Sequence, residues 1–205
     1  MKLAWAVSGA GMGARAVVEA RAAGLLTSKI DLVVFDRTGP TDSMMDYCDQ
    51  RGIAFKVVTP GTLEGELLDA QHRLSFDAMG LTFNRLISQK VIDSFNGRIF
   101  NLHLSLLPMF PGFGATRKAL ESGLAYTGVT VHFVDAGIDT GPIIAQRKVA
   151  IRDSDDTSML GRRQFEAAVP LLLHTVRILE RGNKPSFDEP DPDLVEFGAR
   201  YCSQL

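Results

Sequence analysis

Cysteine is scarce in this chain, since its 205 residues contain two, Cys48 and Cys202. Two cysteines cannot build the disulfide framework of a small secreted domain, and neither stands at a metal-ligand spacing from a histidine. A disulfide scaffold and a zinc finger are therefore excluded. The same pattern favours a reducing, cytoplasmic location and a protein without a bound metal.

Neither sign of charge dominates, because 22 Lys and Arg stand against 24 Asp and Glu and the net charge is −2. Nucleic acids and acidic membranes are bound through clustered Lys and Arg, so neither is expected as a general partner. Apolar runs are also short. None reaches the roughly 20 residues of a transmembrane helix. The first run meets a glycine turn at Gly9 too soon for a signal peptide.

What the chain does contain is the composition of a compact domain, 45% apolar and 22% charged. Short β-branched runs alternate with helical patterns, which predicts an α/β fold: a Rossmann-like, mostly parallel seven-stranded sheet with helices on both faces. The predicted strands are 3–7, 30–35, 55–58, 78–82, 98–102, 129–134 and 143–149. The predicted helices are 13–23, 43–51, 63–72, 89–94, 116–122 and 159–181.

The last predicted helix has recognisable ends. Ser154 and Asp156 are candidates for its N-cap, Gly182 lies near its C-terminal cap and Pro185 follows. Beyond it, residues 186–205 begin with a proline- and acid-rich stretch, which we interpret as an extended tail rather than a second domain.

A glycine turn joins the first predicted strand to the first predicted helix. Gly9, Gly11 and Ala14 match the G-x-G-x-x-G/A dinucleotide fingerprint, and Asp36 supplies an acid about 20 residues further on, the usual ribose anchor. Such a turn also offers free N–H groups and a helix dipole to the phosphate of any ligand. The sequence thus leaves three readings open: a dinucleotide, another phosphate, or glycines that only allow close packing.

Three polar residues form a candidate catalytic group. Asn101 and His103 stand two apart at the end of an apolar run, so in a strand both point to one face. Asp139 lies in a glycine-flanked turn. Singly, each has a structural reading, as a loop cap, a surface histidine or a turn former. Together they offer an amide donor, an imidazole and a carboxylate for acyl transfer. We read His132 as structural or as lying behind the site.

The segments around these residues resemble a known family. NLHLSLLP, PGFGATRKALESG, GVTVHFV and DTGPII are similar to the folate-dependent formyltransferases, and within them to the branch that formylates glycinamide ribonucleotide in purine biosynthesis. The similarity is strongest over residues 83–151. It implies the formyltransferase fold, a transferase of one-carbon metabolism, 10-formyltetrahydrofolate as co-substrate, and Asn101, His103 and Asp139 as catalytic residues.

The resemblance also implies an amine site at the glycine turn, which would hold the substrate phosphate, and at an acid of the last helix, which would grip its ribose. The positions carried over are Gly9, Gly11, Met12, Gly13 and Glu166. The chain departs from the family here, because Ala10, Met12 and Gly13 replace polar Asn and Ser side chains, and Glu166 is one residue too close to Pro170. Phosphate contacts are therefore expected from backbone N–H groups, aided by Arg15.

For the folate, the resemblance implies a pterin site between the NRLIS stretch and the main chain of loop 134–139. The positions carried over are Arg85, Leu86, Ile87, Ile92, Val134, Asp135, Ala136, Gly137 and Asp139. Ordinary core packing is the competing interpretation of Leu86, Ile87 and Ile92. Within a single catalytic domain over 1–205, residues 1–100 then form the substrate-phosphate half and residues 101–185 the catalytic and folate-binding half.

The chemistry expected of the three catalytic residues is direct transfer without an acyl-enzyme. Asn101 donates to the formyl oxygen, while His103, held as imidazolium because Asp139 raises its pKa, stabilises the same oxyanion. Asp139 also accepts the proton that the amine loses. No serine nucleophile is needed, so Ser105 is interpreted as a residue that positions the loop.

Other functions remain open at this stage. They are formylation of another small amine such as an amino sugar, hydrolysis of formyltetrahydrofolate, and a dinucleotide-binding oxidoreductase or sensor that uses Gly9, Gly11, Ala14 and Asp36. A tRNA formyltransferase is not expected, because the chain shows no large basic C-terminal domain. The expected partner is a small, phosphorylated amine, and the expected state is a monomer or homodimer. The proline and glycine residues of loop 109–117 permit it to act as a lid.

Overall fold

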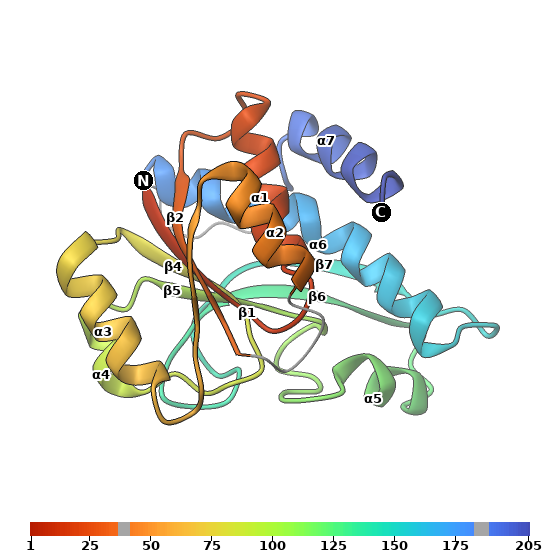
Figure 1. The fold of residues 1–205 in the computed structure, drawn as a ribbon. Coiled ribbons are helices and arrows are strands. Elements are labelled where there is room, and N and C mark those ends of the chain that lie inside the picture. Colours follow the sequence, from red (N-terminus) through yellow and green to blue (C-terminus); the bar gives the residue numbers. More distant parts are fainter. Residues whose placement is uncertain (37–41, 183–188) are drawn as a thin grey trace. The chain divides into compact units, whose positions relative to one another are not determined.

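The structure is a computed structural model that describes residues 1–36, 42–182 and 189–205. Over these residues, seven strands form one sheet in the order β3-β2-β1-β4-β5-β6-β7 (Figure 1). The strands are β1 Lys2–Val7, β2 Lys29–Phe35, β3 Ala54–Val57, β4 Ala78–Thr82, β5 Ile99–His103, β6 Tyr126–Phe133 and β7 Ile143–Ala150. The helices are α1 Met12–Ala22, α2 Asp42–Arg51, α3 Leu63–Leu74, α4 Gln89–Ser94, α5 Ala115–Glu121, α6 Thr157–Glu180 and α7 Pro192–Ser203.

The predicted α/β architecture is confirmed. Strands β1 to β5 pair in parallel and β6 pairs antiparallel with β7, so the sheet is mostly parallel. Each predicted strand and helix is present within a few residues of its expected ends. The chain clusters into two compact units, residues 1–101 with 134–136 (unit 1) and residues 102–133 with 137–205 (unit 2). The division falls inside β5, between Asn101 and Leu102.

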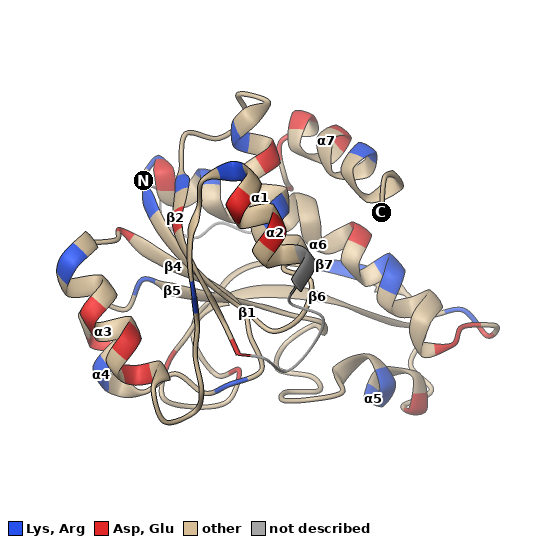
Figure 2. Cartoon of the chain, in the orientation of Figure 1, with Lys and Arg blue, Asp and Glu red and all other residues tan. Residues whose placement is uncertain are grey.

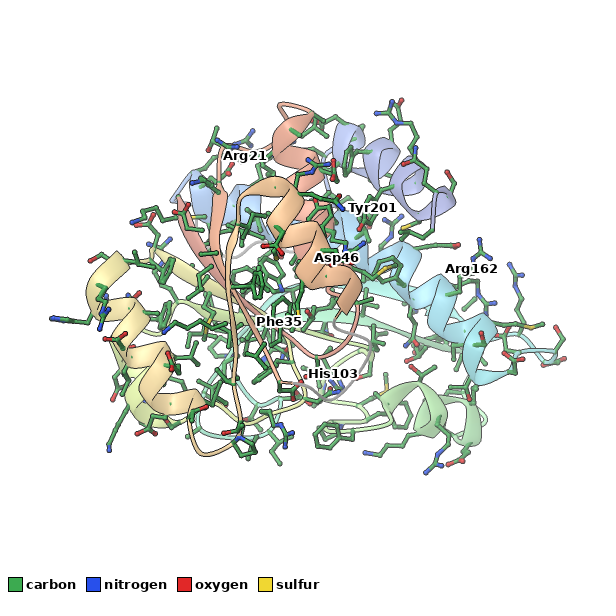
Figure 3. The ribbon with its side chains drawn as sticks, in the orientation of Figure 1. Arg21, Phe35, Asp46, His103, Arg162 and Tyr201 are labelled. Atoms are coloured by element: carbon green, nitrogen blue, oxygen red, sulfur yellow. The ribbon has the colours of Figure 1, made fainter. Side chains whose placement is uncertain are left out.

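Unit 1 buries its central strands on both faces, which explains why their sequences are nearly continuous apolar runs. Trp5 of β1 is fully buried and meets Phe100 edge to face, with 5.6 Å between the ring centroids. A Cβ atom at position 80 would lie 2.6 Å from the Trp5 ring, so only glycine fits beside it on β4. Figure 3 shows Phe35 of β2, also fully buried, among the interior side chains of this unit.

Helices cover both faces of the unit 1 strands, with α1 and α2 on one side and α3 and α4 on the other (Figure 1). On the α3–α4 side, strand residues pack with helix residues in one apolar cluster. Its members include Ala4, Ala6, Leu32, Val34, Met79, Leu81 and Ile99 from strands and Leu63, Leu67, Val91, Ile92 and Phe95 from helices. The alternating strand positions in this set are those that one face of a pleated sheet presents.

Unit 2 is organised by α6, which packs against α5, β6, β7 and α7. Asp156 caps its first turn, as predicted, because its carboxylate accepts the Met159 N–H at 2.7 Å. Gly182, with φ of 65°, follows the C-cap residue Arg181 and donates its N–H to the carbonyl of Leu179. The face of α6 turned outward is polar, and Figure 3 shows Arg162 pointing away from the unit.

The C-terminal tail is not extended as the sequence suggested, because residues 192–203 form helix α7. Asp191 and Pro192 occupy the N-cap and first helical positions, where both residue types are favoured. Leu194, Gly198 and Tyr201 then form a buried stripe at helical spacing. The acid- and proline-rich composition that suggested an extended chain is a helix start signal. Residues 183–188 of the predicted tail, including Pro185, lie outside the described residues.

An ion-pair fork attaches α7 to α6. The Arg177 guanidinium contacts Asp191 at 2.5 Å and Asp193 at 2.8 Å, and only a tenth of the Arg177 side chain is exposed. Gly198 allows close approach, since a Cβ there would lie 3.0 Å from Cδ of Pro170 inside α6. Packing and charge therefore both hold the terminal helix in unit 2.

Charged residues lie mainly on the helices and loops, while β4 carries none (Figure 2). Cys48 and Cys202 are both buried free thiols, and burial raises the pKa of each to about 11. In the described part of the chain, no helix is both long and apolar enough to cross a membrane.

Candidate active site

The carboxyl end of β5 carries Asn101 and His103, and the loop that follows it is fixed by side-chain hydrogen bonds. The Ser105 hydroxyl donates to the Met109 carbonyl at 2.5 Å. Thr130 of β6 donates to the Ser105 carbonyl at 2.6 Å and accepts the Leu107 N–H at 3.1 Å. Ser105 is fully buried. Its contacts agree with its expected role in positioning the loop.

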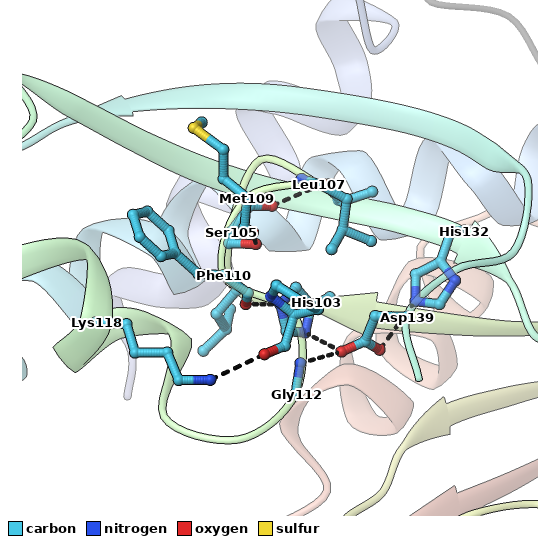
Figure 4. Close-up of polar contacts among 12 residues, drawn as sticks. His103, Ser105, Leu107, Met109, Phe110, Gly112, Lys118, His132 and Asp139 are labelled. Atoms are coloured by element: carbon cyan, nitrogen blue, oxygen red, sulfur yellow. Dashed lines mark hydrogen bonds and ion pairs between the residues drawn. The ribbon is translucent and has the colours of Figure 1, made fainter. Parts of the chain in front are cut away.

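His103 and Asp139 meet in unit 2, although they are 36 positions apart in the chain. His103 Nδ1 lies 3.2 Å from Asp139 Oδ2, and the Gly112 N–H donates to the same oxygen at 2.8 Å (Figure 4). Asp139 has φ of 55°, the left-handed region that costs a residue with a side chain about 1 kcal/mol or more. The turn is therefore held in a conformation that aims the carboxylate at His103.

The second ring nitrogen of His103 also faces an oxygen. Nε2 lies 2.9 Å from the carbonyl oxygen of Phe110, a loop residue with φ of 54° (Figure 4). Only 8% of His103 is exposed. Each neutral tautomer has one N–H, so one of these two contacts would set a lone pair against an oxygen. The geometry is satisfied only when the ring is protonated, or when Phe110 gives way to a donor.

Asp139 does act to raise the pKa of His103, as expected, but the net shift is downward, so the expected resting imidazolium is wrong. Burial lowers the pKa of His103 below its usual value of 6.5, with His132 and Lys118 acting in the same sense. The Phe110 carbonyl and the Asp139 carboxylate oppose this effect but do not overcome it. The cost of desolvating a charge in this pocket exceeds the attraction of one carboxylate, so the resting imidazole is neutral at neutral pH.

Asp139 is ionised at the same site. Burial alone would raise its pKa, but His132, the Gly112 N–H and His103 together lower it from 3.8 to about 2. A neutral imidazole beside an ionised carboxylate can take up one proton, because the carboxylate stabilises the imidazolium that forms.

His132 reaches the same carboxylate, a contact that the sequence did not single out. Its Nε2 lies 3.4 Å from Asp139 Oδ1 (Figure 4). Its Nδ1 lies 2.8 Å from the Phe133 carbonyl oxygen. The available signal was a histidine at the end of the apolar strand that leads into the Asp139 turn. The main-chain partners, Phe110 and Gly112, have no such signal because any residue supplies the same groups.

Gln164 of α6 is hydrogen-bonded to the start of the loop that follows β5. It is fully buried, and its amide donates to the carbonyls of Leu104 at 2.7 Å and Gly128 at 3.1 Å. Its carbonyl oxygen accepts the Thr116 hydroxyl at 2.7 Å. One side chain thus joins α5, α6, β6 and the residue that follows His103.

The glycine turn lies in unit 1 and begins α1. Gly11, with φ of 65°, is the N-cap residue, and a Cβ there would lie 2.7 Å from the Met44 sulfur. Gly9, with φ of 102°, has open space where a Cβ would be. Met12 starts the helix, and Gly13 is buried within it. The Arg15 guanidinium lies 4.8 Å over the Tyr47 ring of α2.

Asp36, the candidate ribose anchor of a dinucleotide, has both carboxylate oxygens engaged. Oδ1 accepts the Ser8 hydroxyl at 2.9 Å, Oδ2 accepts Nε of Arg85 at 2.9 Å, and the residue is 3% exposed. A ribose diol would have to displace these partners from a buried carboxylate. The carboxylate that would bind the ribose of a dinucleotide is therefore already engaged, which argues against the dinucleotide interpretation.

The residues predicted to bind the folate differ in how exposed they are. Ile87 and Ile92 belong to the apolar cluster of unit 1, and Val134 packs against it. Leu86 is 72% exposed, and Arg85 extends from the same stretch to Asp36. Asp135 is half-buried, while Ala136 and Gly137 are exposed. Of Leu86, Ile87 and Ile92, Leu86 is therefore the exposed side chain, and the two isoleucines are core residues.

The predicted ribose ligand, Glu166, lies on α6 in unit 2. Its side chain is 46% exposed and contacts Arg162, one turn earlier, at 3.3 Å. Within residues 1–36, 42–182 and 189–205, no group of three His, Cys, Asp or Glu is arranged to hold a metal ion.

The chain is similar to proteins of one known family. The profile of a family described as formyl transferase matches residues 1–176. Phosphoribosylglycinamide formyltransferase of Bacillus subtilis is 43% identical over 81 residues, 40% of this chain and 42% of that protein. The human trifunctional purine biosynthetic protein adenosine-3 is 30% identical over 196 residues, 88% of this chain and 19% of that protein. The matches thus span less than half of either relative.

A solved structure extends the similarity to nearly a whole chain. The crystal structure of phosphoribosylglycinamide formyltransferase from Bacillus halodurans is 31% identical, with a TM-score of 0.82, over 87% of this chain and 95% of that one. The family profile covers both the glycine turn and the His103–Asp139 pair. This chain belongs to the formyl transferase family.

Proposed function

We propose that this protein transfers the formyl group of 10-formyltetrahydrofolate to the amino group of glycinamide ribonucleotide, a step of purine biosynthesis. The observation that carries the proposal is the pairing of His103 with the ionised Asp139, two positions after Asn101, in a chain of the formyl transferase family. The names of the relatives support this amine over others.

The reaction moves one acyl group and one proton. The neutral amine attacks the formyl carbon, the bond from that carbon to N10 of the folate breaks, and the amine proton goes to N10. Between these events the formyl oxygen carries negative charge. Asn101 donates its amide N–H to this oxygen, and no covalent enzyme intermediate is required.

The lowered pKa of His103 changes the role that the sequence suggested for it. A neutral imidazole with Nδ1–H directed at Asp139 presents the Nε2 lone pair as a base. The amine N–H replaces the Phe110 carbonyl at Nε2, which removes the clash of lone pairs in the resting site. The imidazolium that forms is stabilised by Asp139 and then returns the proton to the leaving N10.

The two substrates bind through different groups. We assign the amine phosphate to the backbone N–H groups of the turn Gly9–Gly13, where Gly9 leaves open space, and its ribose to Glu166. We assign the pterin to exposed Leu86, backed by Ile87 and Ile92, and to the main chain of residues 134–139. Buried free thiols at Cys48 and Cys202 suit a reducing, cytoplasmic setting.

The function is tested by incubating the protein with 10-formyltetrahydrofolate and following release of tetrahydrofolate. Glycinamide ribonucleotide, its dephosphorylated form and an amino sugar are compared as acceptors, with a reaction lacking any amine as the control for hydrolysis. We expect kcat/KM for the phosphorylated amine to exceed that for the dephosphorylated one by at least about tenfold.

The outcomes separate the alternatives. Equal rates with and without an amine identify a hydrolase, and preference for the amino sugar identifies a different acceptor. Equal kcat/KM with and without phosphate removes the phosphate role of the glycine turn. No release of tetrahydrofolate under any condition would overturn the proposal as a whole.

A further inference from the structure

His132 is a buried polar residue for which the proposed reaction has no role. It lies on β6 with 3% of its side chain exposed. A buried imidazole costs free energy unless its nitrogens have partners, and each of them faces an oxygen, Nδ1 that of Phe133 and Nε2 that of Asp139. The ring therefore has a fixed orientation, and one of its two contacts is a group of the candidate site.

The Asp139 carboxylate is held on both of its oxygens. Oδ2 contacts Gly112 and His103, and Oδ1 contacts His132 (Figure 4). Rotation about the bond to the carboxyl group would carry both oxygens out of these directions. A contact at Oδ1 therefore fixes the direction from which Oδ2 meets His103 Nδ1.

We propose that His132 is a positioning residue of the reaction: its Nε2 holds Oδ1 of Asp139, and this fixes the carboxylate oxygen that orients His103. The inference rests on the proposed function. It assigns to His132 no contact with either substrate, and its effect on the reaction passes through Asp139.

The charged groups around His103 determine whether its pKa rises or falls when His132 is removed. Among the described residues, His103 of β5 is influenced by Asp139 of the β6–β7 loop, His132 of β6 and Lys118 of α5. Lys118 donates to the Pro111 carbonyl at 2.9 Å and lowers the pKa of His103, as His132 does. Loss of His132 should raise the pKa of His103, whereas loss of Asp139 should lower it.

The experiment compares His132→Phe with His132→Gln in the full chain. Phenylalanine fills the site without a donor, while the glutamine amide can reach Oδ1 and donate to it. We expect His132→Phe to lower kcat by about 10- to 100-fold with each KM within about twofold, and His132→Gln to recover most of the loss. The acid limb of the kcat profile should lie at lower pH in His132→Phe than in His132→Gln, because only the glutamine keeps Asp139 directed at His103.

A titration of the His103 ring by NMR, without substrates, gives a second readout that does not depend on the proposed reaction. Both variants remove the charge of His132, so the His103 pKa should be higher in His132→Gln than in His132→Phe, where Asp139 is no longer held against His103. A solely structural role predicts a lower Tm in both variants with the same His103 titration in the two, and that result would overturn the inference. If instead the titration shifts as expected while no amine is formylated, the proposed function fails and the positioning of Asp139 stands.

Discussion

His103 and Asp139 form a pair in which the carboxylate is charged and the imidazole is not. The oxygen of Asp139 lies 3.2 Å from Nδ1 of His103, yet burial keeps the pKa of the histidine below its usual value. His103 can consequently accept a proton, and the ionised Asp139 carboxylate beside it stabilises the imidazolium that forms. This property leads to the first two predictions.

Replacing His103 with Ala should lower kcat by roughly 100-fold or more, because it removes the proposed acceptor of the amine proton. Steady-state release of tetrahydrofolate measures the change. His72→Ala, at an exposed position of α3, is the matched control and should keep the activity of the parent protein. Full activity in a folded His103→Ala variant would show that the proton goes elsewhere.

Asp139 should make stability and activity depend on pH in a defined direction. Its pKa is lowered from 3.8 to about 2, so its contribution is present above pH 4 and is lost as pH falls toward 2. The shift corresponds to roughly 2 kcal/mol. Urea unfolding should therefore show that Asp139→Asn lowers stability at pH 7 more than at pH 3.

The activity profile gives a second view of the same residue. Because Asp139 raises the pKa of His103 against the effect of burial, Asp139→Asn should move the acid limb of kcat to lower pH and reduce its maximum. The parent and variant profiles are compared at saturating substrates. An acid limb that stays in place would mean that the limb does not report His103.

A charge placed in the glycine turn should weaken the amine and spare the folate. Ala10→Asp puts a carboxylate beside the proposed phosphate, and we expect the amine KM to rise by at least about tenfold while the folate KM changes less than about twofold. Ala10→Asn has nearly the same shape without the charge and serves as the control. If the two variants behave alike, the turn does not bind an anion. Valine at Gly11 is a poorer probe, because of its contact with Met44.

Removing Gln164 should loosen the catalytic loop. Gln164→Leu leaves the buried carbonyls of Leu104 and Gly128 without their donor, and we expect a loss of about 2–4 kcal/mol in urea unfolding. Thr116→Val removes one hydrogen bond to the same side chain and should cost about 1 kcal/mol. Similar values for both variants would show that the amide of Gln164 is not the main link.

The Arg177 fork should govern the attachment of α7. Arg177→Met removes the partner of Asp191 and Asp193, and we expect a loss of about 1–3 kcal/mol and faster proteolysis within residues 189–205. Because the Arg177 contact lowers the pKa of Asp193, acidification should also loosen the helix. Arg200→Met, on the exposed face of α7, is the control. Unchanged proteolysis would mean that apolar packing alone holds α7.

Much of this protein follows from local sequence. Apolar runs of 4 to 8 residues set the strands, and capping residues such as Asp156 set helix ends, because hydrogen bonding within a turn depends on near neighbours. The C-terminal helix was misread because its acidic and proline-rich start was taken as composition. Asp191, Pro192 and the apolar spacing after them carried the helix signal.

The sequence by itself identified Asn101 and His103 as candidate catalytic residues, since the two-residue period of a strand placed them on one face. Tertiary structure decided the contacts and the pKa of His103. Burial reversed the expected shift in the pKa of His103. Folding brought His132 and Gly112 into contact with Asp139, and Phe110 into contact with His103. Desolvation and long-range contacts depend on every element packed around a group, and no local pattern records them.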